Sequence, residues 1–335
     1  MVNLHLVDCS ATLHNGCSVG RSRSYDCCGF PTGGIYETLR LLNRRDIDLS
    51  RDVFCFIFDR KSFRKDLSTA YKGNRKRATK RFKRQAQLLE QMVDKMGFNN
   101  FAIDGLESDD IIYSICHKYK NNPNVGKIVI YGTDRDLAVN VSPKCTLRST
   151  SSLVPDVNMQ NFPYAFSDTE VVPFNSTLLY KTLRADRSDG LGVIASPQEF
   201  TTIVNKLGKL FPLANLADVN FMDNIIQRLS GTPEEMQAIN ERWNIVRPQL
   251  VDIEVNLTNN LDKTNCKFYC DMLFLKTIAK KLGVPYEACI TKKWRDKLTQ
   301  LAQEIRLEDI ELGMKEQEVY IPKDLKIVED LSDFI

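Results

Sequence analysis

The sequence lacks several features by which whole classes of protein are recognised. It has no run of 18 apolar residues, which excludes a membrane-spanning helix. The opening segment "MVNLHLVDCS" has no basic stretch of the kind that begins a signal peptide. The ten cysteines form no C-x-x-C pair, and His5, His14 and His117 form no cluster. These absences argue against structural zinc and a secreted disulfide framework, and they predict a soluble cytoplasmic protein with reduced thiols.

Positive charge is unevenly distributed along the chain. The 335 residues carry a net charge of only +3, yet the segment "KGNRKRATKRFKR", residues 72–84, has eight Lys or Arg and no acid. Such a run is either a solvated helix face or a surface for nucleic-acid phosphates. Two features favour the second interpretation: Tyr71 precedes the run, and an amphipathic helix begins inside it. The apolar positions of that helix are Phe82, Ala86, Leu89, Val93 and Met96.

Apolar strands alternate with helical patterns over the first 150 residues. The strand-like segments are "NLHLVD", "VFCFIFD" and "KIVIYGTDRD", and the helical patterns lie near residues 32–43, 79–97 and 109–120. This alternation predicts an α/β fold with a mostly parallel sheet and helices on both of its faces. Further helical patterns lie near residues 197–207, 219–229, 232–246, 265–281 and 292–306. We therefore expect an α/β domain over 1–150 and a mainly helical region over 151–335.

Carboxylates gather where these strands end, and ligands of parallel sheets bind at that edge. The acids concerned are Asp8, Asp59, Asp134 and Asp136. The segment "IDGLESDDII" adds three more in four positions: Glu107, Asp109 and Asp110. An acidic first turn of a helix capped by Ser108 explains part of this crowding. The alternative is a divalent cation. Oxygen-only ligands favour Mg²⁺ or Mn²⁺, and two such ions about 4 Å apart suit the hydrolysis of a phosphodiester.

Five motifs, in order along the chain, resemble those of one family. They are "LVDCSATL", "FIFDRKSFRKDLSTAYKGNR", "GLESDDII", "YGTDRDL" and "LRADRSDGLGV". Together they are similar to the phage and bacterial 5′-nucleases, the flap endonucleases and 5′–3′ exonucleases built on a PIN-like domain. The resemblance covers roughly residues 4–193. It implies a nuclease that uses two or more Mg²⁺ or Mn²⁺ ions near the free 5′ ends of DNA or RNA–DNA hybrids. It also implies a role in phage DNA replication, in primer or flap removal, with replication proteins as partners.

The resemblance assigns roles to particular residues. The acids implied around one metal ion are Asp8, Asp59, Glu107, Asp109 and Asp110. Those implied around the second are Asp134, Asp136, Asp186 and Asp189. The residues implied to contact nucleic acid, on a basic helical arch near residues 64–97, are Arg64, Tyr71, Lys72, Arg75, Lys80, Arg81 and Arg84. The residues implied in catalysis are Lys72, Arg75, Asp8, Asp59, Asp110 and Asp136. In the family's "YKxxR" element the lysine and the arginine face the scissile phosphate.

The chain departs from the family after its last acidic motif. The segment "ADRSDGLGVIASPQEF" keeps both aspartates but loses the second Gly-x-Gly turn of the family's helix–turn–helix. This loss puts a potassium site and the usual grip on duplex DNA in doubt. A similar loss is seen in the T-even phage exonuclease with RNase H activity. The segment "NERWNIVRPQLVDIE", residues 240–254, faintly resembles the C-terminal part of that protein.

Other functions remain open from the sequence. The segment "VDCSAT" resembles the first motif of haloacid-dehalogenase-type phosphotransferases, but Ser10 stands where they have their second aspartate. A non-catalytic nucleic-acid-binding replication subunit of the same fold predicts eroded acids, whereas every matched acid is present. A PIN-type ribonuclease is the nearest enzymatic rival, although such domains are commonly shorter and lack the basic arch.

Overall fold

The computed structural model describes residues 1–18, 33–44, 46–49, 51–73, 78–149, 156–162, 175–184, 189, 191–229, 231–258 and 261–262. The chain divides into two compact units. The first comprises residues 1–12, 46–78 and 97–261, and the second comprises residues 13–45, 79–96 and 262–335. All the strands of the described chain belong to the first unit, and so do all the acids discussed below.

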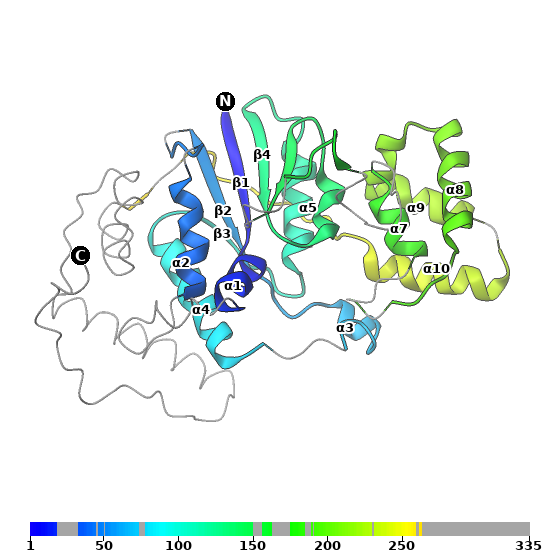
Figure 1. Ribbon diagram of the computed structural model, residues 1–335, viewed down its shortest axis with the longest axis horizontal. Helices are drawn as coiled ribbons and strands as arrows, with labels where there is room; N and C mark the ends of the chain where they lie inside the picture. The colour runs from blue at the N-terminus through cyan, green and yellow to red at the C-terminus, as the bar shows by residue number, and fades with distance from the viewer. Residues whose placement is uncertain are drawn as a thin grey trace, which may run out of the picture. The chain divides into compact units, whose positions relative to one another are not determined.

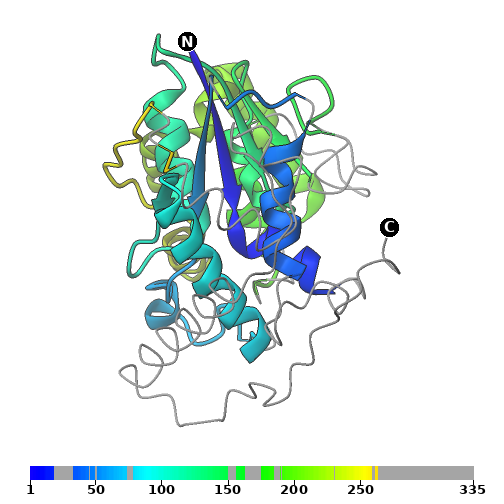
Figure 2. The same cartoon turned by 90° about the vertical axis from the view of Figure 1, so that its left-hand side faces the viewer.

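A parallel sheet forms the centre of the first unit. Its strands are β1 (Val2–Asp8), β2 (Asp52–Ile57), β3 (Asn99–Phe101), β4 (Val125–Tyr131) and β5 (Cys145–Arg148). They lie in the order β3-β2-β1-β4-β5, and every pairing between them is parallel (Figure 1). The central strand β1 leads from the N-terminus directly into α1 (Cys9–Ser18), as Figure 2 shows. The predicted α/β fold with a parallel sheet is confirmed.

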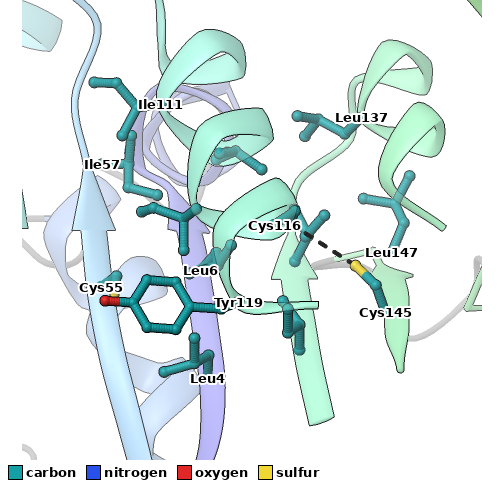
Figure 3. Packing of buried hydrophobic residues seen from close by; sticks show 14 of the residues in the cluster. Leu4, Leu6, Cys55, Ile57, Ile111, Cys116, Tyr119, Leu137, Cys145 and Leu147 are labelled. Atoms are coloured by element: carbon teal, nitrogen blue, oxygen red, sulfur yellow. Dashed lines mark hydrogen bonds between the residues drawn. The ribbon is translucent and has the colours of Figure 1, made fainter. Parts of the chain in front are cut away.

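Helix α5 (Ser108–Tyr119) packs on one face of this sheet. Side chains alternate along a strand, so every second residue of β1 and β2 points to the helix. Leucine, isoleucine and cysteine fill the interface, which removes their apolar surface from water and stabilises the fold. Figure 3 shows this cluster, which includes Leu4, Leu6, Cys55, Ile57, Ile111, Cys116, Tyr119, Leu137, Cys145 and Leu147. On the opposite face of the sheet the ring of His5 stacks on those of Phe54 and Tyr131.

Helices α7 (Thr177–Leu183), α8 (Pro197–Leu210), α9 (Val219–Arg228) and α10 (Pro233–Val246) form the helical part of the first unit, with a 3-10 turn, η4 (Leu213–Ala217). Local sequence determines where α8 and α10 begin. Each has a capping box followed by proline at the first helical position, Ser196 with Glu199 for α8 and Thr232 with Glu235 for α10. Their apolar faces share one core, in which Trp243 is buried and donates to the Asp223 carboxylate at 2.8 Å.

After α10 the chain runs in an extended conformation beside α5. We call residues 247–257 the strap (Figure 1, yellow). Its Val251 N–H donates to the Ser114 hydroxyl at 3.1 Å, and its Val255 N–H donates to the Tyr119 hydroxyl at 2.9 Å. Ile253 and Val255 enter the core between α5 and the sheet. The strap therefore holds α5 by hydrogen bonds along its length as well as by apolar packing.

The described part of the second unit contains α2 (Gly33–Leu39), the 3-10 turn η2 (Arg40–Asn43) and α4 (Lys80–Lys95). Thr79 caps α4 by accepting a hydrogen bond from the Phe82 N–H at 3.2 Å. The Gly34 N–H donates to the buried Gln85 side chain at 2.7 Å. A Cβ at Gly34 would lie 3.0 Å from both Gln85 and Leu13, so a larger residue there would displace this contact.

The predicted helices near 32–43, 79–97, 109–120, 197–207, 219–229 and 232–246 correspond to observed elements. Those near 265–281 and 292–306 lie outside the residues that the structure describes. Helices α1 and α7 and strands β3 and β5 were not expected. Over the described ranges, no helix is both long and apolar enough to cross a membrane.

Candidate metal centre

Asp8, Asp134 and Asp136 lie where β1 and β4 end. Asp8 is the last residue of β1, and its buried carboxylate accepts the Ala11 N–H at 3.0 Å. Asp134 precedes the 3-10 turn η3 (Arg135–Asn140) and caps it by accepting the Asp136 N–H at 3.0 Å. The turn thus fixes Asp134 and Asp136, which are separated by one residue, beside the end of β1.

Asp109, on the first turn of α5, completes a cluster of carboxylates. One oxygen atom from each of Asp109, Asp134 and Asp136 lies within 4.8 Å of the other two. Burial and the nearby charges of Asp134 and Asp8 raise the pKa of Asp109 well above its usual range. For the same two reasons, burial first and then the Asp59 and Asp134 charges, the pKa of Asp8 rises to about 7. The protein therefore holds negative charges together at a cost when no cation is bound.

A divalent cation fits this cluster by its donor set. All the donors are carboxylate oxygens, which Mg²⁺ and Mn²⁺ prefer, and His and Cys are absent from the cluster. Within the described part of the chain, no Lys or Arg forms an ion pair with Asp8, Asp109 or Asp134. A cavity of about 50 Å³ borders Asp109, Asp136 and Asp189, enough for a few ions or water molecules. Two acids of the cluster, Asp109 and Asp136, thus border a space that could admit a cation.

Asp59 and Ser108 lie at the start of α5. Asp59 follows β2, is exposed, and accepts the Ser108 N–H at 2.7 Å. The cap position is Glu107, so the expectation that Ser108 caps the helix is wrong. The physical reason is the capping box of Glu107 and Asp110, in which the Asp110 carboxylate accepts the Glu107 N–H at 3.2 Å. Asp59 accepts the N–H of Ser108 itself.

Glu107 is neutralised by two neighbours from the predicted basic arch. Its carboxylate accepts the Lys72 ammonium at 2.7 Å and the Tyr71 hydroxyl at 2.8 Å. Burial opposes ionisation of Glu107, but the Lys72 charge outweighs it and lowers the pKa of Glu107. Lys72 has a left-handed backbone conformation with φ 52°, and its N–H donates to the Asp189 carbonyl at 3.2 Å. The structure thus brings Lys72, Tyr71, Glu107 and Asp189 together.

Asp110 and Arg64 form a buried ion pair beneath the cluster. Arg64 belongs to α3 (Arg64–Leu67), and both side chains are almost completely buried. The guanidinium binds the carboxylate through two hydrogen bonds, of 2.6 and 2.7 Å. Arg64 therefore faces the protein interior, away from solvent, although its sequence motif predicts contact with nucleic acid.

Lys181, on α7, is a site residue that no sequence motif indicated. Its ammonium contacts the Asp136 carboxylate and lies 3.7 Å from that of Asp189. It therefore bridges an acid of the cluster and an acid of the last motif. It lies three residues before Arg184 in a short apolar helix, where a lysine is ordinarily solvated. Only the folded chain shows that it is nearly buried between two acids.

The remaining predicted residues lie elsewhere or are not described. Lys80 and Arg84 are on α4, with Lys80 exposed and Arg84 partly exposed. Asp186 and Arg75 lie outside the described residues, as does the side chain of Arg81. Nothing in the described chain tests the metal, catalytic or nucleic-acid roles, which stay predictions for every residue named.

The fold and the cluster together define an α/β domain with a cluster of carboxylates at the carboxyl edge of its parallel sheet. Residues 3–166 match the family described as 5′-3′ exonuclease, N-terminal resolvase-like domain. This match covers just under half of the chain, and it confirms the resemblance to 5′-3′ exonucleases that the motifs indicated. The match disfavours the haloacid-dehalogenase alternative.

Individual relatives support the same family. The chain is 30% identical over 112 residues to the 5′-3′ exonuclease of Buchnera aphidicola subsp. Acyrthosiphon pisum, covering 32% of this chain and 38% of the relative. It is 24% identical over 223 residues to the 5′-3′ exonuclease of Bacillus subtilis, covering 66% of this chain and 71% of the relative. This chain thus spans about two fifths of the length of the Buchnera relative.

A solved structure of the T5 5′-exonuclease with bound divalent zinc ions also resembles the chain. It has 17% sequence identity and a TM-score of 0.46, and the likeness covers 90% of this chain and 99% of that chain.

Proposed function

We propose that the protein is a metal-dependent 5′-nuclease that hydrolyses phosphodiesters near the free 5′ ends of nucleic acid. The observation that carries this proposal is the cluster of Asp109, Asp134 and Asp136, whose carboxylate oxygens lie within 4.8 Å of one another at the edge of the sheet. The match of residues 3–166 to the 5′-3′ exonuclease family supports nuclease chemistry at such a cluster. DNA is the proposed substrate, with flap or primer removal during replication as the proposed role.

The chain's own residues would divide the work of the reaction. Asp8, Asp109, Asp134 and Asp136 would hold the metal ions, which when bound supply a Lewis acid and an activated water. Lys72 lies beside the cluster on the neighbouring Glu107, and its ammonium is suited to stabilise charge that develops on a scissile phosphate. The exposed lysines of α4 would attract the phosphate backbone of the strand.

One assay tests the activity and its substrate together. Labelled 5′-flap DNA, nicked duplex, RNA–DNA hybrid and a flap with a blocked 5′ end are each incubated with the protein and Mg²⁺ or Mn²⁺. We expect metal-dependent cleavage of the free flap and slower cleavage of the blocked one, because the strand end must pass the basic arch. Comparison of the RNA–DNA hybrid with the DNA substrates shows whether the protein cleaves RNA as well as DNA strands.

Two matched variants assign the activity to the cluster. Asp109→Asn should reduce cleavage by at least about a hundredfold, since it removes one charge that holds the metal. Asp104→Asn is the control, because it makes the same chemical change at a fully exposed carboxylate. Full activity in Asp109→Asn, or metal-independent cleavage, would contradict the proposal. Binding of flaps without any cleavage would favour the non-catalytic alternative.

A further inference from the structure

The carboxylate of Asp110 has no acceptor site left for a metal ion. A carboxylate offers about four lone-pair directions, two on each oxygen atom. One oxygen accepts Nη2 of Arg64 at 2.6 Å and the Gln249 N–H at 2.9 Å. The other accepts Nη1 of Arg64 at 2.7 Å and the Glu107 N–H at 3.2 Å. Asp110 is thus fully occupied by partners from the protein itself.

The donors of Arg64 are equally complete. Arginine carries five N–H groups. Two bind Asp110, a third lies 3.4 Å from Glu107, and the other two bind the main-chain carbonyls of Ile245 at 2.6 Å and Arg247 at 2.9 Å. These carbonyls belong to the end of α10, where a cation is also favoured by the helix dipole. All four acceptor sites of Asp110 and all five donors of Arg64 therefore have partners within the protein.

Asp109, the adjacent residue, differs from Asp110 in its neighbours and in its accessibility. Its carboxylate lies in the cluster with Asp134 and Asp136, whereas that of Asp110 lies outside the cluster. It is partly accessible, whereas Asp110 is completely buried. A metal ion at Asp110 would have to displace the guanidinium from its two hydrogen bonds to this carboxylate. The two neighbouring acids are therefore built for different tasks.

We propose that Asp110 and Arg64 are positioning residues that anchor the first turn of α5 and so aim Asp109 at the metal centre. This inference rests on the proposed function for its biological meaning and changes the ligand role that sequence resemblance implies for Asp110. Because Arg64 also binds the end of α10, and Gln249 of the strap binds Asp110, the anchor ties three distant segments to the metal-binding turn. The geometry of the centre then depends on the chain beyond residue 240.

The first test measures the melting temperature of the full-length chain without metal. Asp110→Asn should lower it by at least about 5 °C, because the substitution leaves the Arg64 charge buried and unpaired. Asp109→Asn should leave it unchanged or raise it, because like-charge repulsion is relieved. If Asp110 were a ligand crowded by other acids, Asp110→Asn would also be neutral or stabilising, and that result overturns the proposal.

The second test measures the affinity for Mn²⁺, by calorimetry or by the resonance signal of free Mn²⁺. In the anchor role, Arg64→Gln should weaken binding about tenfold, as loss of an outer-shell partner typically does. If Asp110 were a ligand, removal of the competing guanidinium would strengthen binding, which contradicts the proposal. Should Arg64→Gln fail to fold, Arg64→Lys replaces it. Lysine keeps the charge but cannot make five hydrogen bonds, so weaker binding supports the anchor, and unchanged or tighter binding overturns it.

A double variant shows whether the two residues act as a pair. Asp110→Asn combined with Arg64→Gln removes both charges and should recover part of the melting temperature lost in Asp110→Asn alone. Purely additive losses would contradict a pair. Neither melting nor Mn²⁺ binding requires nucleic acid. If the melting temperatures and Mn²⁺ affinities change as expected but no substrate is cleaved, the proposed nuclease function is refuted and the anchor role stands. If substrates are cleaved but these changes are not seen, the anchor role is refuted and the nuclease function stands.

Discussion

Acids gather in two neighbouring parts of the site, at the start of α5 and at the ends of β1 and β4. At the start of α5, Glu107 and Asp110 each have a basic partner that neutralises them. At the strand ends, Asp8 and Asp134 have no such partner among the described residues, and Asp109 joins them from the helix. The difference shows that crowding of acids alone does not identify metal ligands. The charge around each carboxylate also differs, and Asp136 of the cluster is intermediate because the Lys181 ammonium contacts it.

The largest expected effect on cleavage comes from removing an acid of the cluster. Asp134→Asn should reduce cleavage by at least about a hundredfold, because a metal ion loses a ligand at the centre of the cluster. Asp136→Asn should have the same effect on cleavage, although here the Lys181 ammonium also loses its partner. Single-turnover rates at saturating Mg²⁺ measure both. If either variant cleaves at the wild-type rate, the acids at the strand ends are no more important for cleavage than those at the start of α5.

A smaller effect is expected from the cation that balances Glu107. Lys72→Ala should lower the single-turnover rate by at least about tenfold, equivalent to about 1.4 kcal/mol of barrier. The affinity for a 5′-flap should change little. Lys65→Ala, an exposed lysine on α3, is the matched control and should cleave normally. Should both variants behave alike, Lys72 would serve only to balance Glu107.

The unbalanced acids also predict how stability without metal depends on pH. Folded Asp8 keeps its proton up to about pH 7, whereas the unfolded chain loses it near the ordinary value of 3.8. The folded state therefore binds more protons in this range, and stability falls as pH rises from about 4 to 7. The melting temperature should drop by several degrees between pH 5 and pH 8, and Mg²⁺ should restore it.

Asp8→Asn is the variant that tests this origin of the pH dependence. Asparagine cannot ionise, so a good part of the fall in melting temperature should disappear, while that caused by Asp109 remains. The lowered pKa of Glu107 acts in the opposite direction, but its contribution is complete above the ordinary glutamate value of 4.5. A melting temperature that rises between pH 5 and pH 8 would mean that the acids of the cluster are balanced after all.

The smallest effect concerns basic side chains that have no structural task. Lys80→Ala and Lys83→Ala, both exposed on α4, should each weaken flap binding severalfold without lowering the rate at saturation. Each should reduce the dependence of log affinity on log salt by up to about 0.9, one phosphate contact. A filter-binding series over several salt concentrations measures this. If the slope of log affinity against log salt is unchanged in both variants, Lys80 and Lys83 do not contact the phosphates.

The sequence predicted most of the elements that position the site. The observed bounds of α8, α10 and α4 lie close to the predicted ones. Each of these helices has a local sequence signal, a capping box in α8 and α10 and an amphipathic pattern in α4. The short strands β3 and β5 and helix α7 were missed, since three to seven residues carry too little periodicity. The boundary predicted at residue 150 stays a prediction.

Within the site, the sequence indicated which acids come together but not how each is used. Asp109 and Asp110 are adjacent and chemically identical, so no motif separates them. Their roles differ because helical geometry turns one toward the sheet edge and the other toward Arg64. Arg64 and Lys181 illustrate the same limit. A basic residue in a sequence is equally compatible with binding a phosphate and with balancing a carboxylate.

The contact between Arg64 and the end of α10 has a consequence for how the protein is made. Arg64 and Ile245 are 181 positions apart, so this part of the site closes one of the longest loops in the described chain. Closing a long loop is entropically unfavourable and comes late in folding. During synthesis, every acid of the metal cluster leaves the ribosome well before Gln249 does. We therefore expect the emerging chain to acquire tight metal binding only after the strap has been made, which would delay the proposed nuclease activity until most of the protein exists.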